Sequence, residues 1–184
     1  AVYYALARPA LREDAVFLFP DEYGLFRPES AMTHAECAAA LRALAPEERL
    51  DPGLLASLDA EPDGALTREE LKTALEALFD PEAVEPVLEA LPATESDNAA
   101  RAEFAYSVSR LLGKEAAAED IYYPDVAPSH WAASELLAAA GSGALTKDAL
   151  VSMTRDGFLW FGGYLYRLDE NGYFLTDTEF DGLY

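Results

Sequence analysis

The sequence is poor in cysteine, in basic residues and in long apolar segments, and each shortage excludes a class of protein. A single cysteine, Cys37, excludes an internal disulfide framework and a cysteine-rich zinc site. The 184 residues hold 13 Lys and Arg against 34 Asp and Glu, a formal net charge of −21. That balance argues against nucleic acid and anionic lipid surfaces as partners. No apolar run approaches the roughly 20 residues that a membrane-spanning helix needs.

The rest of the composition is that of a folded protein. Hydrophobic residues make up 51% of the chain, which is too high for a disordered one, and the length suits one domain with a small appendage. Alanine is frequent up to Ala149 and absent after it, whereas aromatic residues concentrate from Phe158 onward. Because Ala favours helices and aromatic residues favour strands, we expect a helical domain over residues 1–150 and a β-rich tail over 151–184.

The helical part contains a repeat. Three similar segments, 32–37, 66–71 and 99–104, begin 34 and then 33 residues apart, and each opens an Ala- and Leu-rich stretch with helical spacing. A fainter fourth copy lies at 143–150. Further elements are expected as helices at 51–58, 81–91 and 130–140, the last capped by Ser129, and as a short hairpin at 15–26.

The first two repeats begin with Thr-x-x-Glu, the capping box that starts a helix. The Thr hydroxyl accepts from a first-turn N–H, and the Glu carboxylate accepts from the N–H of the Thr. The motif residues are Thr33 with Glu36 and Thr67 with Glu70. The third copy has Ala100 in place of Thr, so we expect its cap to come from Asp97 or Asn98.

Two segments carry a more specific pattern. Residues 24–36 contain Gly-Leu-Phe-Arg-Pro followed by Thr-His-Ala-Glu, and residues 123–132 read Tyr-Pro-Asp-Val-Ala-Pro-Ser-His-Trp-Ala. They resemble the second and first halves of an S-layer homology (SLH) repeat, and residues 101–113 resemble the second-half helix again. The resemblance implies a bundle of helical repeats at a bacterial cell surface that binds a secondary cell-wall polymer attached to peptidoglycan.

The SLH resemblance also implies a set of ligand-binding residues. In that family the Arg of Thr-Arg-Ala-Glu helps line sugar-binding grooves, and Arg68 and Arg101 match it here, whereas His34 departs from it. The candidate ligand-binding residues are Arg27, Arg68, Arg101, Asp125 and Trp131. The structural alternatives are solvated first-turn charges for the two motif arginines, a core anchor for Trp131 and a local turn bond for Asp125.

The tail carries an aromatic pattern. Residues 161–174 read as two strands joined by Asp-Glu-Asn-Gly at 169–172, and the pattern returns from Phe180. This resembles the cell-wall-binding repeats of surface proteins that recognise choline or glucan. The alternative is a β cap whose aromatic side chains pack on the helical body. The expected fold is therefore mainly α and α+β overall: an SLH-like helical repeat bundle with a short C-terminal antiparallel β-hairpin region.

A twelve-residue stretch at 59–70 has alternating carboxylates and resembles an EF-hand calcium loop. The oxygen ligands would be Asp59, Glu61, Asp63, the Ala65 carbonyl and Glu70, with Gly64 at the sharp turn. The alternative is that Glu70 serves only the capping box, since a cap carboxylate and a bidentate calcium ligand point differently. Calcium is the one cofactor that the sequence suggests.

These patterns predict a non-catalytic cell-surface module that binds or anchors to cell-wall polysaccharide or a peptidoglycan-linked polymer. The alternative is a calcium-binding structural or protein-interaction module. No nucleophile elbow, zinc-protease motif or phosphate-binding loop occurs, so we expect no enzymatic activity. We expect an extracellular protein whose signal peptide has been removed, because the chain opens without a basic and then apolar leader. Cys37 is expected to lie buried on an Ala-rich face.

Overall fold

The computed structural model describes residues 10–13, 15–21, 25–114, 121–122, 125–126, 129–139, 145–146, 154–155, 158–161 and 164–167. Its helices are α1 (His34–Leu44), α2 (Pro52–Ala60), α3 (Arg68–Leu78), α4 (Pro81–Glu89), α5 (Arg101–Leu112), α6 (Ala133–Ala139) and the short 3₁₀ helix η1 (Glu47–Arg49). The expectation of a mainly α fold is confirmed. None of the described helices combines the length and the apolar character needed to cross a membrane.

Capping boxes begin α1 and α3, as expected. The Thr33 hydroxyl accepts from the Glu36 N–H at 3.2 Å, and the Glu36 carboxylate accepts from the Thr33 N–H at 2.9 Å. Thr67 and Glu70 repeat this geometry at 3.2 and 2.8 Å. Two N–H groups at each helix start therefore have partners within their own turn.

Helix α5 begins with only half of this motif. Glu103 accepts from the Ala100 N–H at 3.0 Å, but Ala100 has no side-chain oxygen to accept in return. The expected cap from Asp97 or Asn98 is wrong, since no side chain caps the start of α5. The carbonyl of Asp97 instead accepts from the Arg68 N–H at the start of α3.

The three helix starts are joined by a closed ring of backbone hydrogen bonds. The N–H of Met32 donates to the Ala99 carbonyl at 2.9 Å, that of Ala99 to the Leu66 carbonyl at 2.7 Å, and that of Leu66 back to the Met32 carbonyl at 2.7 Å. All three residues have no exposed surface. The repeats seen in the sequence are thus three neighbours around one centre, which we call the repeat ring.

A second layer of backbone bonds joins the same three repeats, with its donors pointing around the ring in the opposite direction. In each repeat the first helical residue donates its backbone N–H to a carbonyl two residues before the ring residue of the next repeat. The bonds run from His34 to Gly64, from Arg68 to Asp97 and from Arg101 to Ser30, at 2.8–2.9 Å. These N–H groups have no partner within their own helices, so the neighbouring repeat satisfies them.

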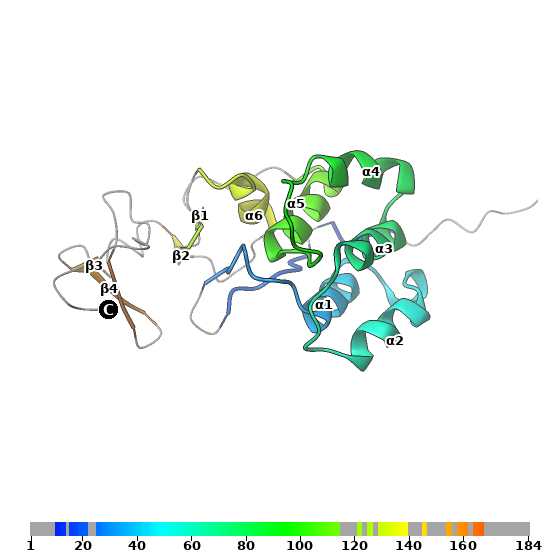
Figure 1. Ribbon diagram of the computed structural model, residues 1–184, viewed down its shortest axis with the longest axis horizontal. Coiled ribbons are helices and arrows are strands. Elements are labelled where there is room, and N and C mark those ends of the chain that lie inside the picture. The colour runs from blue at the N-terminus through cyan, green and yellow to red at the C-terminus, as the bar shows by residue number, and fades with distance from the viewer. Residues whose placement is uncertain are drawn as a thin grey trace, which may run out of the picture.

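The helices pack as pairs around the ring (Figure 1). Helix α1 contacts α2, α3 contacts α4 and α5 contacts α6, while α3 also contacts α1 and α5, and α4 contacts α5. The largest fully buried side chains are Phe26, Met32, Leu41, Leu44, Leu58, Leu66, Leu71, Leu75, Leu78, Phe104 and Leu136. One core therefore runs through all three repeats.

The expectation of an α+β fold with a short C-terminal antiparallel β-hairpin region is wrong. The described chain is mainly helical, and residues 25–114 contain isolated bridges but no strand. Elsewhere short strands pair in ladders: β1 (Ile121–Tyr122) with β2 (Leu145–Thr146), and β4 (Phe158–Phe161) with β3 (Thr154–Arg155) and β5 (Tyr164–Arg167).

The prediction for the tail placed its first strand at the wrong residues. The expected first strand began at Phe161, but Phe161 ends β4 and pairs with Tyr164 across the ladder. The sequence has two glycines between them, and glycine weakens a strand interior. The Asp-Glu-Asn-Gly turn and residues 173–184 lie outside the described residues.

Three further expectations differ in detail. The described residues of 15–26 form no strand, and the Asp21 carboxylate accepts from the Leu25 N–H at 3.0 Å. Helix α6 begins at Ala133 rather than 130, because residues 129–132 form a turn. Of the fourth copy at 143–150, only Leu145–Thr146 is described, and it is strand.

Candidate functional site

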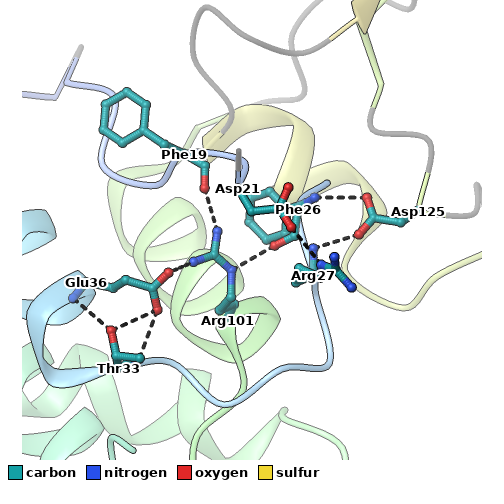
Figure 2. Close-up of polar contacts among 8 residues, drawn as sticks. All are labelled: Phe19, Asp21, Phe26, Arg27, Thr33, Glu36, Arg101 and Asp125. Atoms are coloured by element: carbon teal, nitrogen blue, oxygen red, sulfur yellow. Dashed lines mark hydrogen bonds and ion pairs between the residues drawn. The ribbon is translucent and has the colours of Figure 1, made fainter. Parts of the chain in front are cut away.

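Arg101 lies buried at the start of α5 and bonds three separate segments (Figure 2). Its guanidinium donates to the Phe26 carbonyl at 2.7 Å, to the Phe19 carbonyl at 2.6 Å and to the Glu36 carboxylate. It also lies over the Phe26 ring, 5.0 Å from the ring centre. The Arg101 side chain is only 7% exposed, so its donors are used inside the protein.

Asp125 and Arg27 belong to the same polar cluster. The Asp125 carboxylate accepts from the Phe26 N–H at 2.9 Å and from the Arg27 N–H at 2.7 Å. Arg27 has a φ of 57°, a left-handed conformation that is costly for a residue with a side chain. Its side chain pairs with Asp21 at 2.8 Å. Asp125 therefore binds backbone, as the structural alternative held, but across 98 residues rather than locally.

Arg68, Arg101 and His34 hold equivalent positions in the three repeats. Each side chain contacts the capping Glu of the next repeat around the ring. The pairs are His34 with Glu70, Arg68 with Glu103 and Arg101 with Glu36. The side chain at this motif position thus links neighbouring repeats in all three cases.

His34 performs this role with an imidazole. Its Nδ1 lies 2.9 Å from the Glu61 carbonyl and its Nε2 lies 3.3 Å from the Glu70 carboxylate. Both partners are acceptors, and the two ring nitrogens face one partner each. A Cβ on Gly64 would lie 2.8 Å from His34 Nδ1, which explains glycine at this position without calcium.

A cavity of about 330 Å³ lies among the segments that precede α1, α5 and α6. It is lined by Glu29, Ala31, Pro92, Ala93, Thr94, Ser96, Asn98, Ala100, Glu103 and Trp131. Arg68 stands behind this lining, since its guanidinium donates to the Pro92 carbonyl at 3.3 Å and to Glu103. Two predicted site residues, Arg68 and Trp131, are therefore brought to one place, whereas Arg27, Arg101 and Asp125 form the separate cluster of Figure 2.

Trp131 presents an aromatic face at this cavity. Its indole is 39% exposed and packs against Tyr106 at 5.2 Å and His130 at 5.6 Å between ring centres. These neighbours fix the orientation of the ring while part of it stays accessible. A rigid, half-exposed indole above hydroxyl and amide side chains suits the apolar face and the hydroxyl groups of a sugar.

His130 positions a carboxylate at the same cavity. Its Nδ1 accepts from the Ala132 N–H at 3.1 Å, and its Nε2 lies 2.7 Å from the Glu29 carboxylate. One ring nitrogen accepts and the other donates, which is the pattern of a neutral imidazole. The pair ties the segment of α6 to the chain before α1.

The candidate calcium residues are distributed over different interactions. Asp59 lies in α2 and pairs with Arg42, the carbonyl of Glu61 faces His34, and Glu70 serves the capping box. Within the residues that the structure describes, no three His, Cys, Asp or Glu side chains are grouped to hold a metal ion. Calcium binding stays a prediction, and calorimetric titration of chelator-treated protein tests it.

Burial and hydrogen bonding shift two groups near the ring. Burial, together with the nearby Glu70 charge, raises the pKa of the Cys37 thiol to about 12, so the buried Cys37 is an unreactive thiol at neutral pH. Partial burial acts to raise the pKa of Glu70, but the hydrogen bonds from Thr67 and His34 outweigh it and lower that pKa below its usual value.

Comparison with protein-family models, with curated proteins and with solved structures finds no match to this chain. The site therefore rests on its own geometry. Sequence reasoning missed the contributions of Glu29, His130 and the 92–98 segment to the cavity. The available signal was the Pro-, Thr-, Ser- and Asn-rich composition of that segment, which is typical of an exposed polar loop.

Proposed function

We propose that this chain is a non-catalytic cell-surface module, related in kind to SLH domains, that binds cell-wall polysaccharide in the cavity beside Trp131. The observation that carries the proposal is the half-exposed indole over a cavity of about 330 Å³ lined by hydroxyl, amide and carboxylate side chains. Sugar rings offer such a site an apolar face and several hydroxyl groups.

Two further features support this function. Of the positions that the SLH resemblance marks as ligand-binding, Trp131 lines the cavity, and Arg68 bonds two of its lining residues, Pro92 and Glu103. The net charge of −21 disfavours nucleic acid and anionic membranes as competing partners. Wall polysaccharide remains as a polymer that an acidic protein can bind through stacking and hydrogen bonds.

Co-sedimentation with purified Gram-positive wall sacculi, before and after chemical removal of their secondary polymers, tests the proposal. We expect the protein to pellet with intact sacculi only. The Trp131→Ala variant should stay in the supernatant, because it loses the stacking surface.

The matched control is Phe19→Ala. Phe19 is an aromatic residue with 58% exposure outside the cavity, and its contact with Arg101 uses the backbone carbonyl, which alanine keeps. This variant should pellet like the unmodified protein. Absence of pelleting with intact sacculi, or equal pelleting by a folded Trp131→Ala variant, would reject the proposal.

A further inference from the structure

The charges around the cavity restrict the sugar that it accepts. Among the described residues that line it, none is Lys, Arg or His, and two are acids, Glu29 and Glu103. Resting on the proposed function, we infer that the bound segment is an uncharged saccharide, without carboxylate, phosphate or other acidic groups.

Glu103 contributes little net charge to the cavity. Its side chain is 6% exposed, and its carboxylate accepts from Arg68 and from the Ala100 N–H. The same guanidinium donates to the Pro92 carbonyl, so the arginine that the SLH resemblance assigns to ligand is already bonded within the protein. An acidic sugar would have to displace Glu103 from Arg68 to gain a cationic partner.

Glu29 leaves the cavity rim negative. Its side chain is 73% exposed, and its contact is with His130, whose Nδ1 accepts from the Ala132 N–H. Because His130 Nδ1 already accepts from Ala132, the ring contacts Glu29 through Nε2 alone, and most of the Glu29 side chain stays exposed at the rim. An acidic group on the sugar would meet this carboxylate, and the chain's overall negative charge adds to the repulsion.

The uncharged lining offers complementary contacts to a neutral sugar. Trp131 supplies an aromatic ring, and Thr94, Ser96 and Asn98 supply hydroxyl and amide groups to the lining. Hydroxyl and acetamido groups can exchange hydrogen bonds with such side chains without burying a charge.

Calorimetric titration with a charge-matched pair of ligands tests the inference. The probes are the disaccharide of glucuronic acid and glucose, and the same disaccharide with its carboxylate amidated, with cellobiose as a neutral reference; none of these is the peptidoglycan disaccharide that stripped sacculi retain. At low salt we expect the free acid to bind about fivefold more weakly than the amide, as for like charges a few ångströms apart near water.

Two variants test whether the Glu29 charge causes the weaker binding of the free acid. Glu29→Gln keeps an acceptor for His130 and removes the charge, so the free acid and the amide should bind with equal affinity. Glu48→Gln removes an exposed charge outside the cavity and should leave the difference in affinity between acid and amide unchanged. This result would assign the discrimination to the cavity rim rather than to net charge.

The contrary outcomes are distinct. If the free acid binds as tightly as the amide or more tightly, the inference is overturned while the sacculus result still supports the proposed function. If none of the three saccharides binds, the inference is also overturned, and Trp131-dependent pelleting decides separately whether the polysaccharide function stands.

Discussion

Arg101, Arg68 and His34 show how one motif position can serve a structural purpose where the SLH resemblance suggested a ligand. Each reaches the capping Glu of the next repeat, so one carboxylate both caps its own helix and contacts the Arg or His side chain of its neighbour. Local helix formation and repeat association therefore depend on the same atoms. Changes at these residues should alter the stability of the whole body rather than one helix.

The Arg101→Ala variant should lower the free energy of unfolding by about 2–4 kcal/mol, since it leaves the Phe19 and Phe26 carbonyls without the guanidinium that donates to them. Urea denaturation measures this change. The control is Arg110→Ala, whose guanidinium is 59% exposed and lies 3.8 Å from Glu135, and which should cost under about 1 kcal/mol. Similar losses in both variants would contradict the assigned role of Arg101.

Glu70 should contribute to acid sensitivity. Its pKa is lowered in the folded state, so its stabilising effect is present above the unfolded carboxyl pKa of about 4.3 and is lost as the pH falls through the folded value. The stability difference between the unmodified protein and Glu70→Gln should therefore shrink from pH 7 to pH 3. Glu69→Gln, at the exposed neighbouring position, should show no such trend. Urea denaturation across this pH range is the measurement, and a constant difference for Glu70→Gln would refute the role.

At the scale of the helix, the three starts differ in one hydroxyl. Helices α1 and α3 have complete capping boxes, whereas α5 keeps only the carboxylate half. The ring bonds and the inter-repeat N–H bonds are the same in all three. The start of α5 is therefore held by its neighbours more than by its own sequence.

This difference predicts opposite effects of exchanging the residues. Thr67→Ala should destabilise the protein by about 1 kcal/mol, the usual cost of losing an N-cap. Ala100→Thr should raise stability by up to a similar amount, because its hydroxyl can accept from the Glu103 N–H. Thermal unfolding followed by circular dichroism measures both, and a loss of stability in Ala100→Thr would show that the cavity side of Ala100 has no room for the larger side chain.

Helices were predictable from the sequence where the residues that cause them lie close together in the chain. Capping motifs and helical spacing predicted helices in the six regions of α1 to α6 and the repeat, because their causes lie within one or two turns. The pairing of Met32, Leu66 and Ala99 was not predictable, since it joins segments more than 30 residues apart. The tail strands were misplaced because aromatic content indicates strand but not register.

For the site, residue types were predictable but their partners were not. Asp125 and Arg101 were singled out by pattern, yet their bonds to the segment around Phe26 depend on the closed arrangement of all three repeats. The cavity combines Trp131 with residues from two other parts of the chain. A site of this kind exists only after the repeats have assembled.

At the scale of the molecule, the excess of acidic residues opposes compaction. A charge of −21 repels itself at low ionic strength, and salt shortens the range of that repulsion from about 30 Å at 0.01 M to about 8 Å at 0.15 M. The melting temperature should therefore rise with sodium chloride over this range. Scanning calorimetry in the presence of a calcium chelator measures the rise without a contribution from calcium, and a flat or falling melting temperature would contradict it.

The repeat ring also limits how such a protein can change in length. In a linear solenoid each new unit stacks on an open end, so units can be gained or lost singly. Here Ala99 bonds to Leu66 and Met32 bonds to Ala99, and the three N–H donors and three carbonyls of the ring are all used. A fourth unit inserted in tandem would find no vacant position, and would have to replace an existing unit or complete a ring with a second molecule. Growth by duplication should therefore proceed in complete sets of three.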